Sequence, residues 1–233
     1  MMKVIFPRIF GILAFLGILV ACTQDLSKSS GSDDLVIYPP PPDTTRIQYL
    51  TSFSSSHDLK GKQSAFNRYI LGEEVPKPII KPYGITVRNS KIYICDSGLG
   101  GLVIIDLADN NFEYFIPGGL GQLQLPLNCS VDESGFLYVA DGNRRQVVVF
   151  NNQGKYVSAF GEKSETFKPT DVVVEDDSVY VASVSDRKIF VYNRVNDSLL
   201  FHFPDMEPGD EGYLYQPVNI IVDPLYIYIS DIG

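Results

Sequence analysis

The sequence predicts an all-β fold made of a repeated unit of four short antiparallel strands. Three observations support this prediction: a pattern that recurs every 43 to 48 residues, short apolar runs separated by polar turns, and no helical 3.6-residue periodicity within the units. Aromatic residues make up 12% of the 233-residue chain, although it contains no tryptophan. Tyrosine and phenylalanine suit the half-buried surface of a sheet, so the composition agrees with the pattern.

The repeat aligns most clearly on proline. Each unit opens with a proline and an apolar strand, and the spacings between these prolines are 44, 43 and 48 residues: Pro82, Pro126, Pro169 and Pro217. A polar turn and a second apolar strand follow, the latter reading IYICD, LYVAD, VYVAS and IYISD. A third strand and a more polar fourth segment, such as residues 155–161, complete the unit. A period of about 40–45 residues with four strands is that of a β-propeller blade.

The pattern P-x-G/N/D-I/V-x-V, followed by LYVAD-x-x-x-R-x-V-x-V-F, resembles the NHL-repeat, six-bladed β-propeller group in its bacterial lipoprotein form. The resemblance covers residues 46–233, and Ser183 departs from it because the other units have aspartate there. It implies six blades, which need roughly 270 residues, whereas about four are present. We therefore expect a C-terminally truncated part of a longer protein.

Two elements are predicted before the first unit. Residues 46–55 alternate between apolar and polar side chains, as expected of an outer strand that closes the ring with the last blade. Residues 64–72 read SAFNRYILG, with an N-cap serine, apolar residues at helical spacing and a terminating glycine. A short helix packed on one face of the propeller is expected there.

Residues 1–21 are predicted to be a signal peptide. Lys3 and Arg8 precede an apolar run over residues 9–21, which is too short to span a bilayer comfortably. The run ends in LVAC, which closely resembles the lipobox of bacterial lipoproteins. The resemblance implies cleavage before Cys22, whose thiol then carries diacylglycerol and whose amine is usually acylated, for example with palmitate. Such chains would anchor the protein to a membrane. The alternative is a secretory signal with an incidental cysteine.

The predicted order is therefore a signal peptide (1–21), a flexible and proline-rich tether (22–45) and an incomplete propeller (46–233). Thr23 stands where an aspartate would suggest inner-membrane retention, so we expect a lipid-anchored protein of the bacterial cell envelope, at the outer membrane. The net charge of −9 at pH 7 disfavours nucleic acid as a partner. Cys95 and Cys129 fall in strand patterns and are expected to be buried thiols, although an exported chain could oxidise them.

One face of the predicted propeller is a candidate ligand surface. In each blade, the loop entering the first strand and the loop between the second and third strands lie on this face, and such loops often carry function. The candidate residues are Asp96, Asp141, Asn143, Arg144, Arg145, Asp186, Arg187 and Asp231. Turn chemistry alone can account for the aspartates, whereas the arginines could bind a phosphate or carboxylate.

A second candidate site lies two residues after each proline. Asn128, Asp171 and Asn219 occupy this position in the last three units, and Gly84 occupies it in the first. Their oxygen atoms, at the start of the innermost strand, would suit Ca²⁺ in the central channel. Propeller lactonases, which resemble this architecture, hold such an ion and hydrolyse esters with it. Alternatively, these side chains only bind loop backbone or channel water.

Two functions follow from these observations. The first is binding or scaffolding by an envelope lipoprotein whose ligand is an unknown protein, glycan or peptide. The second is a channel-metal hydrolase or lyase resembling lactonases. No catalytic residue is predicted, because His57 and His202 have no zinc-ligand spacing and the sequence contains no G-x-S-x-G motif.

Overall fold

The structure is a computed structural model that describes residues 36–60 and 64–233. The chain divides into two compact units, of which the second comprises Ser52–Gly233. In the first unit, strand β1 (Ile37–Tyr38) pairs antiparallel with β2 (Ile47–Gln48), and the proline run lies in the loop between them. The predicted signal peptide and Cys22 lie outside the described residues. No helix in the described part of the chain is long and apolar enough to cross a bilayer.

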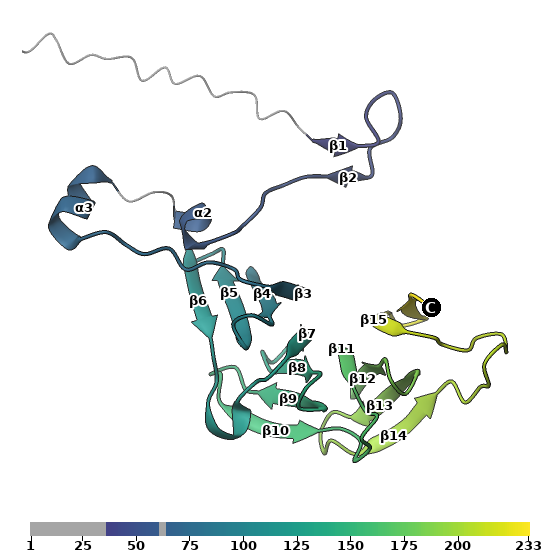
Figure 1. The fold of residues 1–233 in the computed structure, drawn as a ribbon. Helices are drawn as coiled ribbons and strands as arrows, with labels where there is room; N and C mark the ends of the chain where they lie inside the picture. Colours follow the sequence, from purple (N-terminus) through teal and green to yellow (C-terminus); the bar gives the residue numbers. More distant parts are fainter. Residues whose placement is uncertain (1–35, 61–63) are drawn as a thin grey trace, which may run out of the picture. The chain divides into compact units, whose positions relative to one another are not determined.

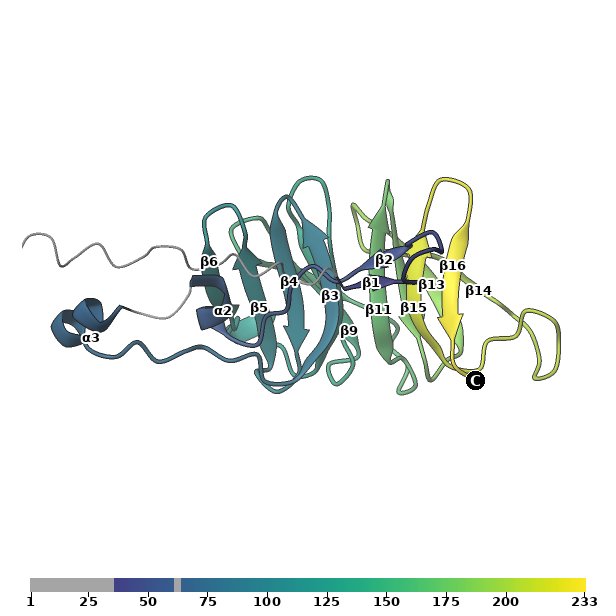
Figure 2. The same cartoon turned by 90° about the horizontal axis from the view of Figure 1, so that it is seen from above.

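The second unit consists of successive antiparallel sheets, which confirms the predicted β-propeller architecture (Figures 1 and 2). The first blade contains β3 (Pro82–Arg88), β4 (Lys91–Asp96), β5 (Gly101–Asp106) and β6 (Asn111–Phe115). The second contains β7 (Pro126–Val131), β8 (Leu137–Asp141), β9 (Gln146–Phe150) and β10 (Tyr156–Phe160). The third contains β11 (Pro169–Glu175), β12 (Ser178–Ser183), β13 (Lys188–Asn193) and β14 (Leu199–Phe203). Two strands of a fourth follow, β15 (Pro217–Val222) and β16 (Ile227–Asp231).

Each innermost strand begins at the proline of its repeat, where the missing amide hydrogen removes no interior ladder bond. The pairing with the second strand then shifts by one residue immediately after the proline. In the third blade, for example, Pro169 pairs with Ser183 and Asp171 pairs with Ala182, which leaves Thr170 as the extra residue of a β-bulge. Bulges re-aim the side chains beside them, and here they set the direction of the predicted channel residues.

Consecutive blades pack face to face through buried apolar side chains. Tyr138 on β8 is 3% exposed because it packs in a cluster with Val172 and other residues of the third blade. The equivalent of Tyr138 on β16, Tyr228, has no following blade against it in the described part of the chain and is 53% exposed. Likewise, Ile85 on the first innermost strand is 62% exposed, whereas the equivalent Val172 on the third is 1% exposed. Burying a side chain of this size contributes about 1.5–3 kcal/mol. The contacts between blades therefore form the core.

The remaining elements are short: α2 (Ser56–Lys60), α3 (Ala65–Leu71) and the 3₁₀ turn η1 (Gly119–Gly121). The predicted helix is present as α3, but its predicted packing is wrong, because Phe66 and Tyr69 are 72% and 87% exposed. Helical spacing groups apolar side chains on one side without specifying what covers them. The strand predicted over residues 46–55 is also too long, since only Ile47–Gln48 forms a strand, and it pairs within the first unit.

Candidate functional site

The aspartate that ends the second strand joins two loops on one face of its blade. In the second blade, Asp141 is fully buried, and its Oδ1 accepts hydrogen bonds from the amides of Leu125, Asn143 and Arg144 at 3.0, 3.2 and 3.0 Å. Its Oδ2 accepts one from the Gln124 amide at 2.7 Å. The entering loop and the loop between the second and third strands therefore meet at this carboxylate, as expected of one shared face.

The equivalent aspartates have the same role. The carboxylate of Asp96 accepts hydrogen bonds from the amides of Ile80, Lys81, Gly98 and Leu99. That of Asp231 accepts hydrogen bonds from the amides of Tyr215, Gln216 and Gly233. These carboxylates face the backbone of their own loops, so the geometry is that of turn stabilisation.

The third blade reaches the same result with different residues. Ser183 replaces the aspartate, and its hydroxyl accepts a hydrogen bond from the Lys168 amide at 2.9 Å while donating to Asp186 Oδ2 at 2.7 Å. Asp186 also accepts a hydrogen bond from the Thr166 hydroxyl. Asp186, three residues later, therefore supplies a carboxylate that accepts hydrogen bonds within these loops, as the aspartate does in the other blades.

The three candidate arginines differ in their surroundings. Arg144 donates to the carbonyl oxygens of Leu120 and Gln122 at 2.9 and 2.7 Å, so it stabilises the entering loop. Arg145 and Arg187 are exposed and share one turn position, with left-handed φ values of 57° and 58°. Gly100 has φ 64° at the equivalent position of the first blade. A non-glycine residue in this conformation costs about 1–2 kcal/mol, which directs attention to the two exposed arginine side chains.

Arg187 lies in a surface pocket of about 330 Å³ on this loop face. The pocket is lined by Ser185, Asp186, Arg187, Lys188, Pro204, Met206, Glu207, Pro208 and Tyr213. The Arg187 guanidinium lies 5.8 Å from the centre of the Tyr213 ring and donates a hydrogen bond to the Tyr213 hydroxyl. Lys188, in contrast, forms an ion pair with Asp205. Arg187 therefore contributes a positive charge that is held in place by an aromatic residue.

The second wall of this pocket comes from the longest connection between blades. The spacing of 48 residues between Pro169 and Pro217 exceeds the others by four or five residues, and the extra length falls in the segment after β14. Residues 204–213 of that segment contribute Pro204, Met206 and Tyr213 to the pocket. Insertions in repeat proteins are concentrated on loops of one face, which is often the binding face. The longer spacing is visible in the sequence, but the sequence does not show that the extra residues lie beside Arg187.

The predicted channel residues come together along the innermost strands. Asn128, Asp171 and Asn219 all line one groove of about 440 Å³ that crosses β7, β11 and β15. Gly84 lies beside them, because a Cβ atom there would be 2.3 Å from Asn128 Oδ1 and 2.4 Å from the Leu127 carbonyl oxygen. Glycine at this position thus lets the second blade approach the first.

Asp171 is the centre of this group and is 3% exposed. Its Oδ1 accepts the Val172 amide at 2.8 Å, and its Oδ2 accepts the amide of Ile220, on the next blade, at 2.7 Å. Burial raises the pKa of the Asp171 carboxyl to about 6, even though these amides and the Asn128 and Asn219 side chains act in the opposite direction as hydrogen-bond partners. Asp171 therefore links the third blade to both of its neighbours.

As folded, oxygens of Asn128 and Asp171 accept backbone amides, and a bound Ca²⁺ at this group stays a prediction. Both carboxylate oxygens of Asp171 accept backbone amides, and Asn128 Oδ1 accepts the Cys129 amide at 2.9 Å. Ca²⁺ takes six to eight oxygen ligands directed at one point, whereas these oxygens are directed at separate amides. Among the residues that the structure describes, no group of three or more His, Cys, Asp and Glu side chains is placed to hold a metal ion, but this set contains only one such residue, Asp171. The geometry is that of the alternative interpretation, hydrogen bonding to backbone.

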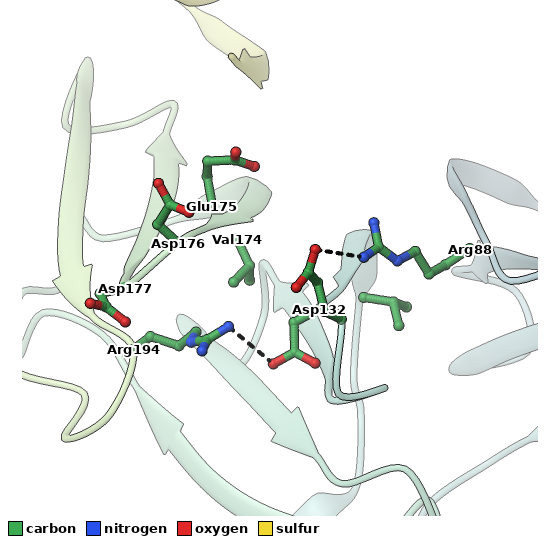
Figure 3. Close-up of a pocket in the computed structure, with 9 residues that line it drawn as sticks. Arg88, Asp132, Val174, Glu175, Asp176, Asp177 and Arg194 are labelled. Atoms are coloured by element: carbon green, nitrogen blue, oxygen red, sulfur yellow. Dashed lines mark ion pairs between the residues drawn. The ribbon is translucent and has the colours of Figure 1, made fainter. Parts of the chain in front are cut away.

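The opposite face carries a pocket that sequence reasoning missed. It has a volume of about 510 Å³ and is lined by Arg88, Val131, Asp132, Glu133, Val174, Glu175, Asp176, Asp177 and Arg194 (Figure 3). Arg88 pairs with Glu133 at 3.6 Å, and Arg194 pairs with Asp132 at 3.7 Å. The sequence contains the acidic residues of this pocket in the turns DESG and EDDS, but the repeat pattern identifies these turns only as connections between strands. The Arg88–Glu133 pair is exposed, and such pairs contribute little stability, whereas Asp132 in the other pair is buried.

Comparison with known proteins identifies the fold. No family model matches the chain, and no curated protein matches it. Virginiamycin B lyase from Staphylococcus aureus aligns with a TM-score of 0.51 and 13% identity over 65% of this chain and 49% of that one. Hydrazine synthase from Kuenenia stuttgartiensis aligns with a TM-score of 0.50 and 18% identity over 67% of this chain and 43% of that one. The chain thus spans about half the length of these structures or less. At such identities the likeness shows the β-propeller fold alone.

Proposed function

We propose that this chain is the propeller of a lipid-anchored protein of the bacterial cell envelope, and that its loop face binds a protein, glycan or peptide. The anchor rests on the positive start, the short apolar run and the LVAC sequence, which ends at Cys22. The repeat pattern supports a place in the NHL-type, six-bladed group. Binding as the main role rests on the pocket around Arg187.

The observation that carries the binding role is the guanidinium of Arg187 in its pocket. Its hydrogen-bond partner in the described part of the chain is a neutral tyrosine hydroxyl, so its charge can still bind an anion. Pro204, Met206 and the Tyr213 ring supply apolar surface beside it. This combination favours a ligand that carries a carboxylate next to a less polar body, as acidic sugars and peptide C-termini do.

Binding can be tested by calorimetric titration of the full chain with D-glucuronate and with a blocked dipeptide that has a free C-terminal carboxylate. Arg187→Gln should weaken binding at least about tenfold, since hydrogen bonds to charged groups contribute about 1.5–3 kcal/mol. Arg145→Gln is the matched control, because Arg145 has the same turn position but does not line the pocket. The proposal fails if neither probe binds or if both variants weaken binding equally.

Anchoring can be tested separately, by fractionating cells that express the full chain and by measuring the mass of its N-terminal peptide. We expect the protein in the outer-membrane fraction with an acylated Cys22, and we expect Cys22→Ser to remain unacylated. An unmodified Cys22 in the wild-type protein would contradict the lipoprotein assignment.

The alternative, a channel-metal hydrolase or lyase, rests on Asp171 and its two asparagine neighbours in the channel groove. The lyase among the structural neighbours is only 13% identical, so it supports the fold and not the activity. Because the oxygens of this group accept backbone amides, we do not assign a metal-dependent step to it.

A further inference from the structure

The two cysteines that follow Cys22 face each other across the first contact between blades. The chain has three cysteines in all. Cys95 on β4 is 0% exposed and Cys129 on β7 is 4% exposed, and both belong to one buried cluster between the first and second blades. Two residues 34 positions apart in sequence are thus brought together by the packing of one blade on the next.

This contact recurs at every blade boundary, but with other residues. Cys95 directly precedes the last residue of the second strand, as Ala140 and Ala182 do in the next two blades. Cys129 is the fourth residue of its innermost strand, and the equivalents are Val172 and Ile220. Ala140 shares a buried cluster with Val172, and Ala182 shares one with Ile220. Among the boundaries between blades that the structure describes, only the first carries a thiol on both sides of the contact.

We propose that Cys95 and Cys129 form a disulfide that joins the first blade to the second when the protein folds in an oxidising compartment. The formation of this disulfide in the cell rests on the proposed export of the protein. In the reaction each thiol loses its proton, the pair loses two electrons, and a low-molecular-weight or protein disulfide accepts both and leaves as two thiols. The bond replaces an ordinary apolar contact with a covalent one.

The disulfide forms as the two blades come together, while the thiols are still accessible to the oxidant. Burial, together with the neighbouring Cys129 thiol, raises the pKa of Cys95 well above its ordinary value in the folded protein. Because the thiolate is the reactive form, thiols in the closed interface exchange slowly. Once formed, the bond closes a loop of about 34 residues, which stabilises the fold mainly by restricting the unfolded chain.

The test uses the full chain carrying Cys22→Ser, refolded once with reduced and oxidised glutathione and once with dithiothreitol. After alkylation under denaturing conditions, the oxidised sample should retain no reactive thiol and should weigh two hydrogen atoms less than the reduced chain. Trypsin leaves both cysteines in one peptide, whereas a glutamate-specific protease cleaves at Glu113 and separates them. A linked pair of peptides identifies the bond. Two alkylated cysteines in the oxidised, folded sample would overturn the proposal.

The matched control is the double variant Cys95→Ala with Cys129→Val, which reproduces the Ala140 and Val172 contact of the second boundary. The protein refolded with dithiothreitol should melt roughly 5–10 °C below the protein refolded with glutathione, whereas the double variant should have the same Tm after either refolding. An equal change in both would also overturn the proposal. Refolding is done outside the cell, so these outcomes do not depend on export. If the bond forms in vitro but both thiols are free in freshly alkylated cells, it is the export proposal that fails.

Discussion

Replacing Asp141 with alanine should strongly destabilise the second blade. The substitution removes the acceptor of four backbone amides, those of Gln124, Leu125, Asn143 and Arg144, at a fully buried position. A hydrogen bond to a charged group contributes about 1.5–3 kcal/mol, and contributions within one network are not additive. We therefore expect the free energy of unfolding to fall by about 4–5 kcal/mol, near the upper end for one substitution.

Urea denaturation followed by circular dichroism would measure this loss, and two variants make the test specific. Asp141→Asn keeps one acceptor oxygen but places an amino group near one of the amides, so it should lose about half as much. Asp231→Ala removes the equivalent carboxylate where the surrounding backbone is exposed, so it should cost about 1–2 kcal/mol. The explanation is refuted if Asp141→Ala costs less than about 1 kcal/mol, or if Asp231→Ala costs as much.

Three further predictions concern the channel groove. Gly84→Ala should destabilise the protein by about 2–3 kcal/mol in the same denaturation assay, since its Cβ would lie 2.4 Å from the Leu127 carbonyl oxygen; an unchanged midpoint would contradict the close approach. Because burial raises the pKa of Asp171 from 3.8 to about 6, the stability it contributes is present below pH 4 and is lost as pH rises through 6. Between pH 4 and 7, wild type should lose about 2–3 kcal/mol relative to Asp171→Asn, and parallel curves would disprove this. Millimolar Ca²⁺ should not raise the Tm, whereas a rise would restore the metal hypothesis.

The sequence was sufficient to predict the blades, because the residues that define each blade lie close together in the chain. A proline starts the innermost strand, alternating and apolar runs define the strands, and polar turns separate them, so all of these signals are local. The boundaries of β7 (Pro126–Val131) and β8 (Leu137–Asp141) match the runs PLNCSV and LYVAD. The positions of Asn128, Asp171 and Asn219 in one groove could also be predicted, since equivalent residues of a repeat occupy equivalent places.

Only the tertiary structure decided what those side chains do. Asp141 and Asp171 are candidate functional residues from the sequence because both carry carboxylates at the predicted sites. The direction of each carboxylate, however, depends on which amides lie beside it after packing. Likewise, the apolar spacing of α3 predicted a helix and not its exposure, and the chain alone does not reveal that Cys95 meets Cys129. Contacts between blades join residues far apart in sequence, and no local pattern encodes which surfaces meet. The sequence by itself determined the repeated strands, whereas packing between blades determined which polar groups are buried in internal hydrogen bonds and which, like Arg187, stay exposed.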